Sequence, residues 1–405
     1  MVSWNMERYE LVIVGGGMVG LTMALALRPM LDLNCKIALI DPAPKPTQRP
    51  LESPSFDDRS TALSSYTLNT FNTLGLTTLQ QNSSPITAIE VSDRGHAGYH
   101  HMSAQEQGFD SYGAVVANKT LGQLLWQTAS ELNIEYRFNQ RVTNIEANQN
   151  GHQLTLDGGS QLSSQYVLLC DGGRSELHKQ LGLQEKTHHF QARARIATVQ
   201  TQLPHIGKAF ERFTESGPIA LLPFGEFSAL VWTLPEKIYP SISALDKAET
   251  LVWLNQQFGQ RLGTITAISE WQEYPLIEKQ LPISISHGFI ALGNAAVTLH
   301  PVAGQGFNLA IRGIMRCAAL LNSEYQSHQS LPNFAQWQAL SDGIQIDQSK
   351  TVMFSKKLIQ LFESSNVATQ IARGIGLNSL DRHPLISQSF ALAGMGLVQN
   401  APSQL

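Results

Sequence analysis

Three glycines near the start of the chain, spaced as Gly15-x-Gly17-x-x-Gly20, form the first pattern that points to chemistry. They follow an apolar run at residues 9–14, open a segment with helical spacing, and precede Asp41 by about 20 residues. Such a turn lets the backbone approach a pyrophosphate, and the next helix offers it free N–H groups. Asp41 can accept hydrogen bonds from a ribose 2′-hydroxyl, which favours FAD or NAD over a 2′-phosphorylated cofactor. The alternative is a glycine-rich turn that binds nothing.

A second segment, residues 292–308, follows another apolar strand-like run and combines small with polar residues. Its candidate ligand contacts are Asn294, Gly304, Gln305, Gly306 and Asn308, with Gly293 allowing close backbone approach. Asn294 can hydrogen-bond a polyol chain, and the glycines at 304–306 present N–H groups at a helix start, which stabilises negative charge. A nicotinamide cofactor has no use for a polyol contact here, so the segment favours FAD. The alternative is an ordinary strand–loop–helix connection.

Further candidates carry weaker signals. Asp171 follows an apolar run and precedes two glycines, which suits a place near the ribityl–pyrophosphate part of FAD, although such pairs are usually plain turns. Arg59 can reach a pyrophosphate through charge-assisted hydrogen bonds, with a surface ion pair as the alternative. Four aromatic residues are candidates for lining a substrate cleft, and core packing is their more common role: Phe210, Phe213, Phe224 and Trp232.

Composition limits the class of protein. The chain has 405 residues, 42% of them apolar, enough for two or three folded domains at about 150 residues each. Its 28 Lys and Arg against 32 Asp and Glu give a net charge of −4, which argues against nonspecific nucleic-acid binding. Three scattered cysteines indicate neither disulfides nor zinc, and they fit a reducing compartment. No apolar run reaches the roughly 18 residues of a membrane span and no signal-peptide stretch is seen, so we expect a cytoplasmic protein.

Strands and helices must position these candidates. The pattern predicts strands at residues 9–14 and 35–40, a helix from Met18 to Arg28 closed by Pro29, and a helix over residues 60–74. Short alternating segments between residues 188 and 278, separated by Gly and Pro, predict an antiparallel sheet. A buried strand near residue 290 precedes a helix over 306–321, and the chain after residue 331 is mostly helical in pattern.

We therefore expect an α/β protein with a Rossmann-like FAD-binding domain, an antiparallel-sheet substrate domain and a C-terminal helical region. The FAD-binding domain is expected to be discontinuous and to comprise residues 1–83, 101–180 and 280–325. The substrate domain takes residues 84–100 and 181–279, and the helical region takes residues 326–405.

Together, the cofactor motifs resemble those of flavoprotein aromatic hydroxylases with the p-hydroxybenzoate hydroxylase fold, over about residues 8–320. Four strings narrow the resemblance to the ubiquinone-biosynthesis branch, and within it to hydroxylases of 2-polyprenyl-6-methoxyphenol: VSDRGHAG at 91–98, AFERFT at 209–214, GPIALLP at 217–223 and LGNAA at 292–296. The chain departs from the broad family at Asn294, where that family usually has Asp. Asn keeps the hydrogen bond to the ribityl hydroxyl and drops the charge.

This resemblance implies an FAD-dependent enzyme that uses O2 and a transiently bound NAD(P)H. It would hydroxylate a polyprenylated phenol to the 1,4-benzoquinol. It matches FAD contacts to Gly15, Gly17, Gly20, Asp41, Arg59, Gln123, Asp171, Asn294, Gly304, Gln305, Gly306 and Asn308. It assigns no catalytic acid or base. His300 and Pro301 lie where the family's loop passes the flavin ring, and proton transfer and helix capping are equal alternatives for His300.

A polyprenyl tail implies contact with a membrane surface or with lipid-carrying subunits of a biosynthetic complex. The C-terminal region is the candidate for this contact because it carries an apolar stripe at helical spacing, for which packing on the FAD-binding domain is the alternative. The stripe comprises Met353, Phe354, Leu358, Ile359, Leu361 and Phe362. Three competing functions are a sibling hydroxylase acting at another ring position, a non-catalytic FAD-binding scaffold and an NAD-dependent dehydrogenase.

Overall fold

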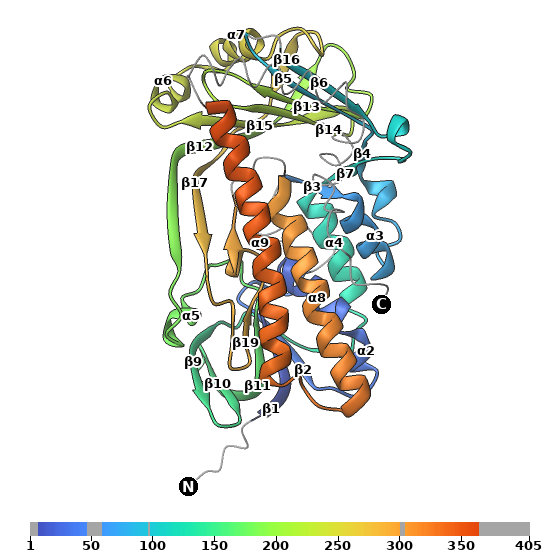
Figure 1. Ribbon diagram of the computed structural model, residues 1–405, viewed down its shortest axis with the longest axis vertical. Coiled ribbons are helices and arrows are strands. Elements are labelled where there is room, and N and C mark those ends of the chain that lie inside the picture. Colours follow the sequence, from blue (N-terminus) through green and yellow to red (C-terminus); the bar gives the residue numbers. More distant parts are fainter. Residues whose placement is uncertain (1–6, 47–58, 96–97, 300–303, 364–405) are drawn as a thin grey trace.

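The computed structural model describes residues 7–46, 59–95, 98–299 and 304–363, and two large β-sheets lie at opposite ends of its long axis (Figure 1). The first sheet has the order β18-β19-β11-β1-β2-β8. Its strands are β18 (Ile285–Ser286), β19 (Phe289–Ala291), β11 (Gln161–Leu169), β1 (Glu7–Val14), β2 (Ile37–Asp41) and β8 (Glu135–Phe138). In addition, β10 (Gly151–Leu156) pairs with β11, and β9 (Val142–Asn148) pairs with β10. The run from β19 to β8 is parallel.

Both faces of this first sheet are buried, as its continuous apolar strands require. In β1, Leu11 and Ile13 enter one core cluster, whereas Val12 and Val14 enter the other. The first cluster packs against α1 (Met18–Ala26), α4 (Asn118–Ala129) and α8 (Gln305–His328). Successive strand residues point to opposite faces, so this alternation fixes which side of β1 the helices cover.

The second sheet has the order β20-β17-β12-β15-β14-β13-β5-β6, with β16 paired to β12. Its strands are β20 (Val297–Thr298), β17 (Gln272–Gln280), β12 (Lys186–Thr201), β15 (Phe227–Pro235), β14 (Ile219–Phe224), β13 (Lys208–Phe213), β5 (Ala88–Asp93), β6 (Tyr99–Ser103) and β16 (Ile265–Ile268). All neighbours are antiparallel except β13 and β5. The outer face is covered by α6 (Tyr239–Ser243) and α7 (Lys247–Phe258). The N-terminus of α7 has a capping box formed by Asp246 and Glu249.

A small third sheet joins these layers and corrects one sequence prediction. It contains β3 (Ser60–Ser64), β7 (Gly113–Ala117) and β4 (Ser84–Ile86). The helix expected over residues 60–74 begins only with α3 (Ser65–Thr73), because residues 60–64 pair with β7. The Ser64 side chain accepts a hydrogen bond from Thr67 N at 3.3 Å and so caps that later start.

The helix predicted from Met18 to Arg28 also ends earlier than expected, at Ala26. Pro29 does not close it, but lies in the first turn of α2 (Arg28–Leu31), where a missing N–H has no cost. The remaining short elements are α5 (Leu177–Gln180) and the 3-10 turns η1 (Gln80–Asn82), η2 (Gln105–Gln107) and η3 (Gly293–Ala295). No helix within the described ranges is long and apolar enough to cross a membrane.

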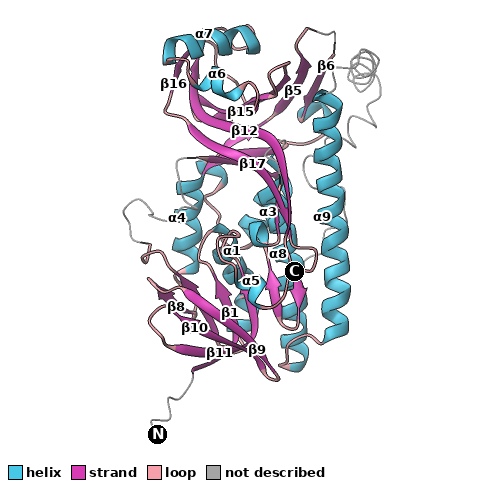
Figure 2. Cartoon of the chain, turned by 90° about the vertical axis from the view of Figure 1, so that its left-hand side faces the viewer, coloured by secondary structure: helices cyan, strands magenta, loops and turns pink. Residues whose placement is uncertain are grey.

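Two long strands connect the ends of the molecule (Figure 2). The 16-residue β12 pairs with β17 from Lys186 to Ile196, with a register irregularity between His189 and Arg193. β17 then pairs at Lys279 with Thr298 of β20. This two-stranded ribbon runs from the region of α5 into the second sheet. The domain boundaries drawn from the sequence stay a prediction, and β20 of the second sheet falls within the segment predicted for the FAD-binding domain.

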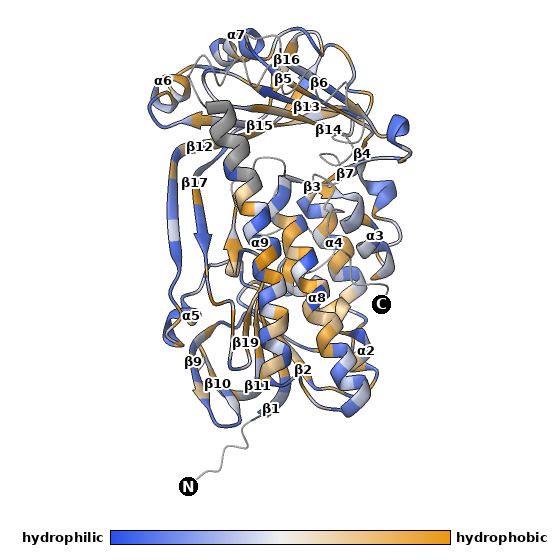
Figure 3. Cartoon of the chain, viewed as in Figure 1, coloured by the Kyte–Doolittle hydropathy of each residue, from blue (hydrophilic) through white to orange (hydrophobic). Residues whose placement is uncertain are grey.

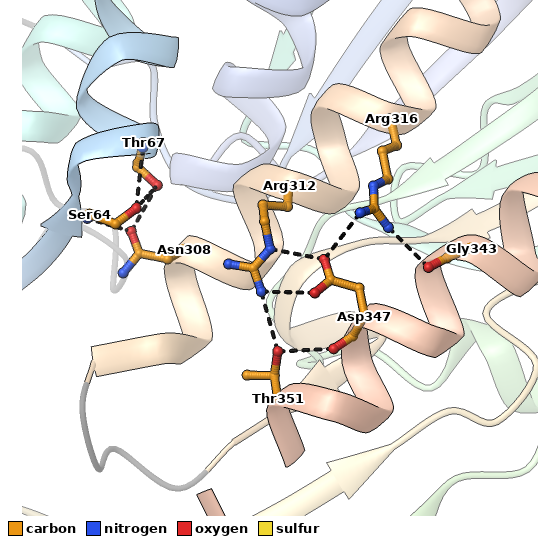
Figure 4. A network of polar contacts seen from close by, with 8 residues as sticks. All are labelled: Ser64, Thr67, Asn308, Arg312, Arg316, Gly343, Asp347 and Thr351. Carbon is orange, nitrogen blue, oxygen red and sulfur yellow. Dashed lines mark hydrogen bonds and ion pairs between the residues drawn. The ribbon is translucent and has the colours of Figure 1, made fainter. Parts of the chain in front are cut away.

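The helix α9 (Phe334–Glu363) lies along α8, and both helices alternate apolar with polar stretches (Figure 3). A buried ion pair joins them: the Arg312 guanidinium donates to both carboxylate oxygens of Asp347 at 2.9 and 3.1 Å and to Thr351 Oγ1 at 3.2 Å (Figure 4). Further along α9, Lys356 Nζ lies 2.8 Å from Glu278 Oε1 on β17. Thus α9 is held to the helical layer and to the long ribbon.

We predict that Asp347→Asn lowers the free energy of unfolding by about 3 kcal/mol, because it leaves the Arg312 charge buried without its counter-ion. Chemical denaturation monitored by circular dichroism measures this change. The control is Glu270→Gln, which removes the exposed Lys247–Glu270 pair with its 3.9 Å separation and is expected to leave stability unchanged. Equal stability of the two variants would contradict the prediction.

Candidate functional site

A large cavity lies between the helical side of the first sheet and the inner face of the second. Its volume is about 2570 Å³, including the part open to solvent. The part of it that water-sized molecules can fill is about 530 Å³, which lies within the roughly 300–1,000 Å³ of ligand pockets. It is lined by the start of α1, strand β3, the start of α8, the loops after β11 and β19, and the inner face of the second sheet.

The turn between β1 and α1 depends on close backbone contacts. Gly15 has φ +106°, and a Cβ there would lie 2.7 Å from Asp171 Cα. A Cβ on Gly20 would lie 1.8 Å from the Gly15 carbonyl oxygen, so only glycine fits. Asp41 Oδ2 accepts a hydrogen bond from Gly16 N at 2.5 Å, and its Oδ1 accepts one from Ala43 N at 2.7 Å. In this structure Asp41 therefore holds the glycine turn itself.

Two helices begin at the cavity without a cap. Gly17 precedes α1 and lines the cavity, and α1 has neither a side-chain cap nor an acid in its first turn. The same holds for α8, which follows Gly304 at φ +60° and whose first residues, Gln305 and Gly306, also line the cavity. A Cβ on Gly306 would meet nothing within 4 Å. The first N–H groups of a helix have no partner within the helix, and its N-terminus is the positive end of the dipole, so the starts of these two helices make this wall favourable for anionic groups.

Asn308 fixes the start of α8 against β3 and α3. Its Oδ1 accepts hydrogen bonds from Ser64 N at 2.9 Å and Thr67 Oγ1 at 2.8 Å (Figure 4). Its Nδ2 donates to Ala62 O and Gly304 O, both at 3.0 Å. Because four protein groups use the amide, Asn308 positions the helix start at the cavity edge, a role that the motif alone did not indicate.

The loop after β11 packs against the loop after β19. Asp171 Oδ1 accepts a hydrogen bond from Gly173 N at 2.9 Å, and Oδ2 accepts one from Ser175 N at 2.6 Å. A Cβ on Gly173 would lie 2.8 Å from the Asn294 carbonyl oxygen, so the two loops touch through backbone. Asn294 is exposed and lines the cavity. Asp171 therefore shapes the loop that borders Asn294.

The structure brings most of the predicted contacts together. Gly17, Arg59, Asn294, Gly304, Gln305, Gly306 and Asn308 line the cavity, while Gly15, Gly20, Asp41 and Asp171 shape its edge. The Arg59 guanidinium also lies 4.9 Å from the centre of the Tyr274 ring. Gln123 is exposed on α4 and is not among the cavity-lining residues. His300 and Pro301 fall outside the described residues.

The predicted aromatic lining divides between the two faces of the second sheet. Phe210 and Phe213 border the cavity, and Phe210 also packs on Phe258 at 5.7 Å between ring centres. Trp232 is fully buried in the outer core, which is the alternative role that the sequence left open. Phe224 packs in a separate apolar cluster and does not line the cavity.

Two polar residues line the cavity although the sequence patterns assign them no role. Tyr112 lines the cavity with a buried hydroxyl that has no hydrogen-bond partner among the described residues, and burial raises its pKa to about 12. Glu211 lines it from β13, and burial raises the pKa of its carboxyl to about 7. The signal for Glu211 was present in the AFERF string, where alternation places it on the same face as Ala209 and Phe213. Among the described residues, no group of His, Cys, Asp and Glu could hold a metal ion.

Comparisons with known proteins agree with this geometry. A model of the FAD-binding domain family matches residues 8–331. The ubiquinone hydroxylase UbiL of Rhodospirillum rubrum is 28% identical over 97% of this chain and 91% of its own. The 3-demethoxyubiquinol 3-hydroxylase of Escherichia coli is 26% identical over 75% of this chain and 77% of its own. The resemblance to ubiquinone-biosynthesis hydroxylases is therefore confirmed.

Solved structures confirm the expected fold. The p-nitrophenol 4-monooxygenase PnpA of Pseudomonas putida superposes with a TM-score of 0.78 at 16% identity, over 98% of this chain and 100% of its own. PqsL of Pseudomonas aeruginosa gives 0.70 at 16% identity, over 92% and 100%. The family model spans most of the chain and the cavity suits an anionic dinucleotide, so the prediction of FAD is confirmed. The chain belongs to the family of proteins built on this FAD-binding domain, and FAD is its cofactor.

Proposed function

We propose that this chain is an FAD-dependent hydroxylase that acts on the aromatic ring of a polyprenylated phenol in ubiquinone biosynthesis, with NAD(P)H as reductant and O2 as oxidant. The observation that carries the proposal is one cavity with two unlike walls: helix N-termini on one side and an apolar sheet face on the other. The relatives named as ubiquinone hydroxylases support the substrate class. The four sequence strings support 2-polyprenyl-6-methoxyphenol as the substrate and the 1,4-benzoquinol as the product.

The first wall fits FAD. The uncapped N-terminus of α1 suits the pyrophosphate, and the N-terminus of α8 suits the pyrimidine end of the flavin. Asn294 lines the same cavity and suits the ribityl chain, and Arg59 lines it and suits the phosphates. Gly15, Gly20, Asp41, Asp171 and Asn308 position these contacts, and Gln123 is proposed with less support because it does not line the cavity.

The second wall fits an apolar ring that carries a prenyl chain. Its inner face presents Ile89, Val91, Met102, Ile196, Leu222 and Val231. Each buried CH2 group of a prenyl chain contributes about 0.8 kcal/mol to transfer from water, so these apolar side chains suit the prenyl chain. Bound FAD supplies the oxygen-transfer chemistry. The chain's own residues hold the ring against it and keep water from the reacting atoms.

The substrate's insolubility in water leads to a further part of the proposal. We propose that the enzyme is cytoplasmic and receives its substrate at a membrane surface or from a lipid-carrying subunit of a biosynthetic complex. Of the predicted C-terminal stripe, Met353 is 52% exposed, which suits such a contact. The side chains of Phe354, Leu358, Ile359, Leu361 and Phe362 lie outside the described part of the chain.

Gly306→Val tests the position proposed for FAD. The added side chain points into open cavity, so folding is retained, but it occupies space that the flavin needs. We expect FAD affinity to fall at least about tenfold, or 1.4 kcal/mol, measured by fluorescence titration of the apoprotein. Gly313→Val on the same helix is the matched control, because its Cβ also meets nothing within 4 Å but Gly313 does not line this cavity. Unchanged affinity in Gly306→Val would place the flavin elsewhere.

The activity itself is tested with purified FAD-loaded enzyme and 2-geranyl-6-methoxyphenol in detergent. We expect the phenol to stimulate NAD(P)H oxidation and, under 18O2, to gain one labelled oxygen, read by mass spectrometry. Cells lacking the chain should accumulate a polyprenylphenol that lacks one ring oxygen, and fragmentation identifies the missing position. An oxygen missing at another position would indicate the sibling hydroxylase. A yellow protein without substrate-stimulated oxidation would indicate a scaffold.

A further inference from the structure

Glu211 stands out on the inner face of the second sheet because every residue beside it there is apolar. Across the sheet, β-pairing aligns it with Val91 on one side and with Ala220, Val231 and Ile196 on the other. Along β13 its same-face neighbours are Ala209 and Phe213. All these residues line the cavity, and Glu211 is the one acidic residue among the described lining residues.

Arg212 and Glu90 of these strands lie on the opposite face, where they have partners. Arg212 donates from Nε to the Gln257 carbonyl at 2.9 Å and from a guanidinium NH2 group to Ser92 Oγ at 3.2 Å. Glu90 pairs with Arg261 at 2.5 Å. Within the part of the chain that the structure describes, the Glu211 carboxyl has no hydrogen bond or ion pair. A carboxyl without a partner in an apolar wall lowers stability, so packing gives no reason for it.

Few titratable groups face Glu211, and one of them is the buried Asp93 of β5, which pairs with Phe213 and lies on the same face as Val91. Arg59 and Arg174 line the same cavity from the cofactor side, and Tyr112 lines it from beside β7. His100 of β6 is buried beyond Val91 in the same cross-strand row. None of these groups shifts the pKa of the Glu211 carboxyl. Burial alone raises its pKa from the ordinary 4.5 to about 7, which is where a general base works best near neutral pH.

We propose that the Glu211 carboxylate accepts the proton of the substrate's phenolic hydroxyl during hydroxylation. This inference rests on the proposed function. The phenol O–H bond breaks, the carboxylate gains the proton, and the electron pair left on the phenolate oxygen is delocalised into the ring. The ring carbon ortho or para to that oxygen then forms its new C–O bond more readily. Overall, phenol, O2, NAD(P)H and H⁺ give quinol, NAD(P)⁺ and water, and Glu211 returns its proton to solvent or product.

Glu211→Gln tests this role because it keeps the shape and hydrogen-bonding capacity but cannot take a proton. With 2-geranyl-6-methoxyphenol, we expect wild-type product formation to rise with pH through about 7 and then level off. In the variant, kcat for hydroxylated product should fall about 100-fold and rise only towards the phenol's own pKa, near 10. FAD content should be unchanged. Glu215→Gln, at an exposed position four residues along, should match the wild type in rate and pH profile.

A 3,5-difluorinated form of the same phenol, which is more acidic than the parent and still free at the para carbon, separates proton transfer from binding. A larger fraction of it is ionised at each pH, so the rate of Glu211→Gln relative to the wild type should recover and its pH profile should shift to lower pH. A raised KM with unchanged kcat, or no rescue by the acidic phenol, would overturn the proposed role. So would a variant that equals the wild type in rate and pH profile. A wild-type enzyme that hydroxylates no phenol would instead overturn the proposed function, and this inference with it.

Thermal unfolding gives a readout that needs no substrate. The raised pKa means that ionisation of Glu211 destabilises the folded state, an effect absent below pH 4.5 and complete above about pH 7. The melting temperature of the FAD-loaded wild type should therefore fall more between pH 5 and pH 8 than that of Glu211→Gln. Glu215→Gln should follow the wild type. Equal pH dependence in all three proteins would show that the carboxyl is not held in an apolar wall and would overturn the proposal.

Discussion

Contact between backbones at the end of β1 is the constraint on which the site depends. There β1, β11 and the first turn of α1 approach so closely that a methyl group on Gly20 would overlap the carbonyl of Gly15. This contact aims the α1 N-terminus into the cavity, and Asp41 keeps the turn in place by bonding its backbone. The second N-terminus, that of α8, is fixed by the side chain of Asn308. The cofactor wall is thus assembled from backbone groups that side chains only orient.

The two faces of the second sheet differ in character. The inner face, towards the cavity, is largely apolar, whereas the outer face carries charged residues. Alternation along β13 places Arg212 on the side of α7 and Glu211 on the side of the cavity. Arg212 on the outer face has a partner in the Gln257 carbonyl, whereas Glu211 on the inner face is surrounded by Val, Ala, Ile and Phe. A cavity with polar N–H groups on one wall and hydrocarbon on the other can orient a ligand that is itself half polar and half apolar.

Sequence reasoning succeeded where the signal was local. The glycine turn, the strand before it and the helix after it lie within 20 residues, and the fold class and FAD followed from such segments. It failed at residues 60–64, because their strand conformation depends on pairing with β7, which lies 49 to 57 residues further along the chain. The positioning role of Asn308 depends on Ser64, 244 residues distant. Glu211 was passed over because its face is set by how α7 covers the sheet, which AFERF alone does not reveal.

The ribbon of β12 and β17 has a mechanical consequence. The same two strands run from the region of α5 into the second sheet, and α9 bridges to β17 through Lys356 and Glu278. Swinging one sheet away from the other would have to bend this ribbon and break the Lys356–Glu278 ion pair. The ribbon and α9 therefore restrain the distance between the cofactor wall and the apolar wall.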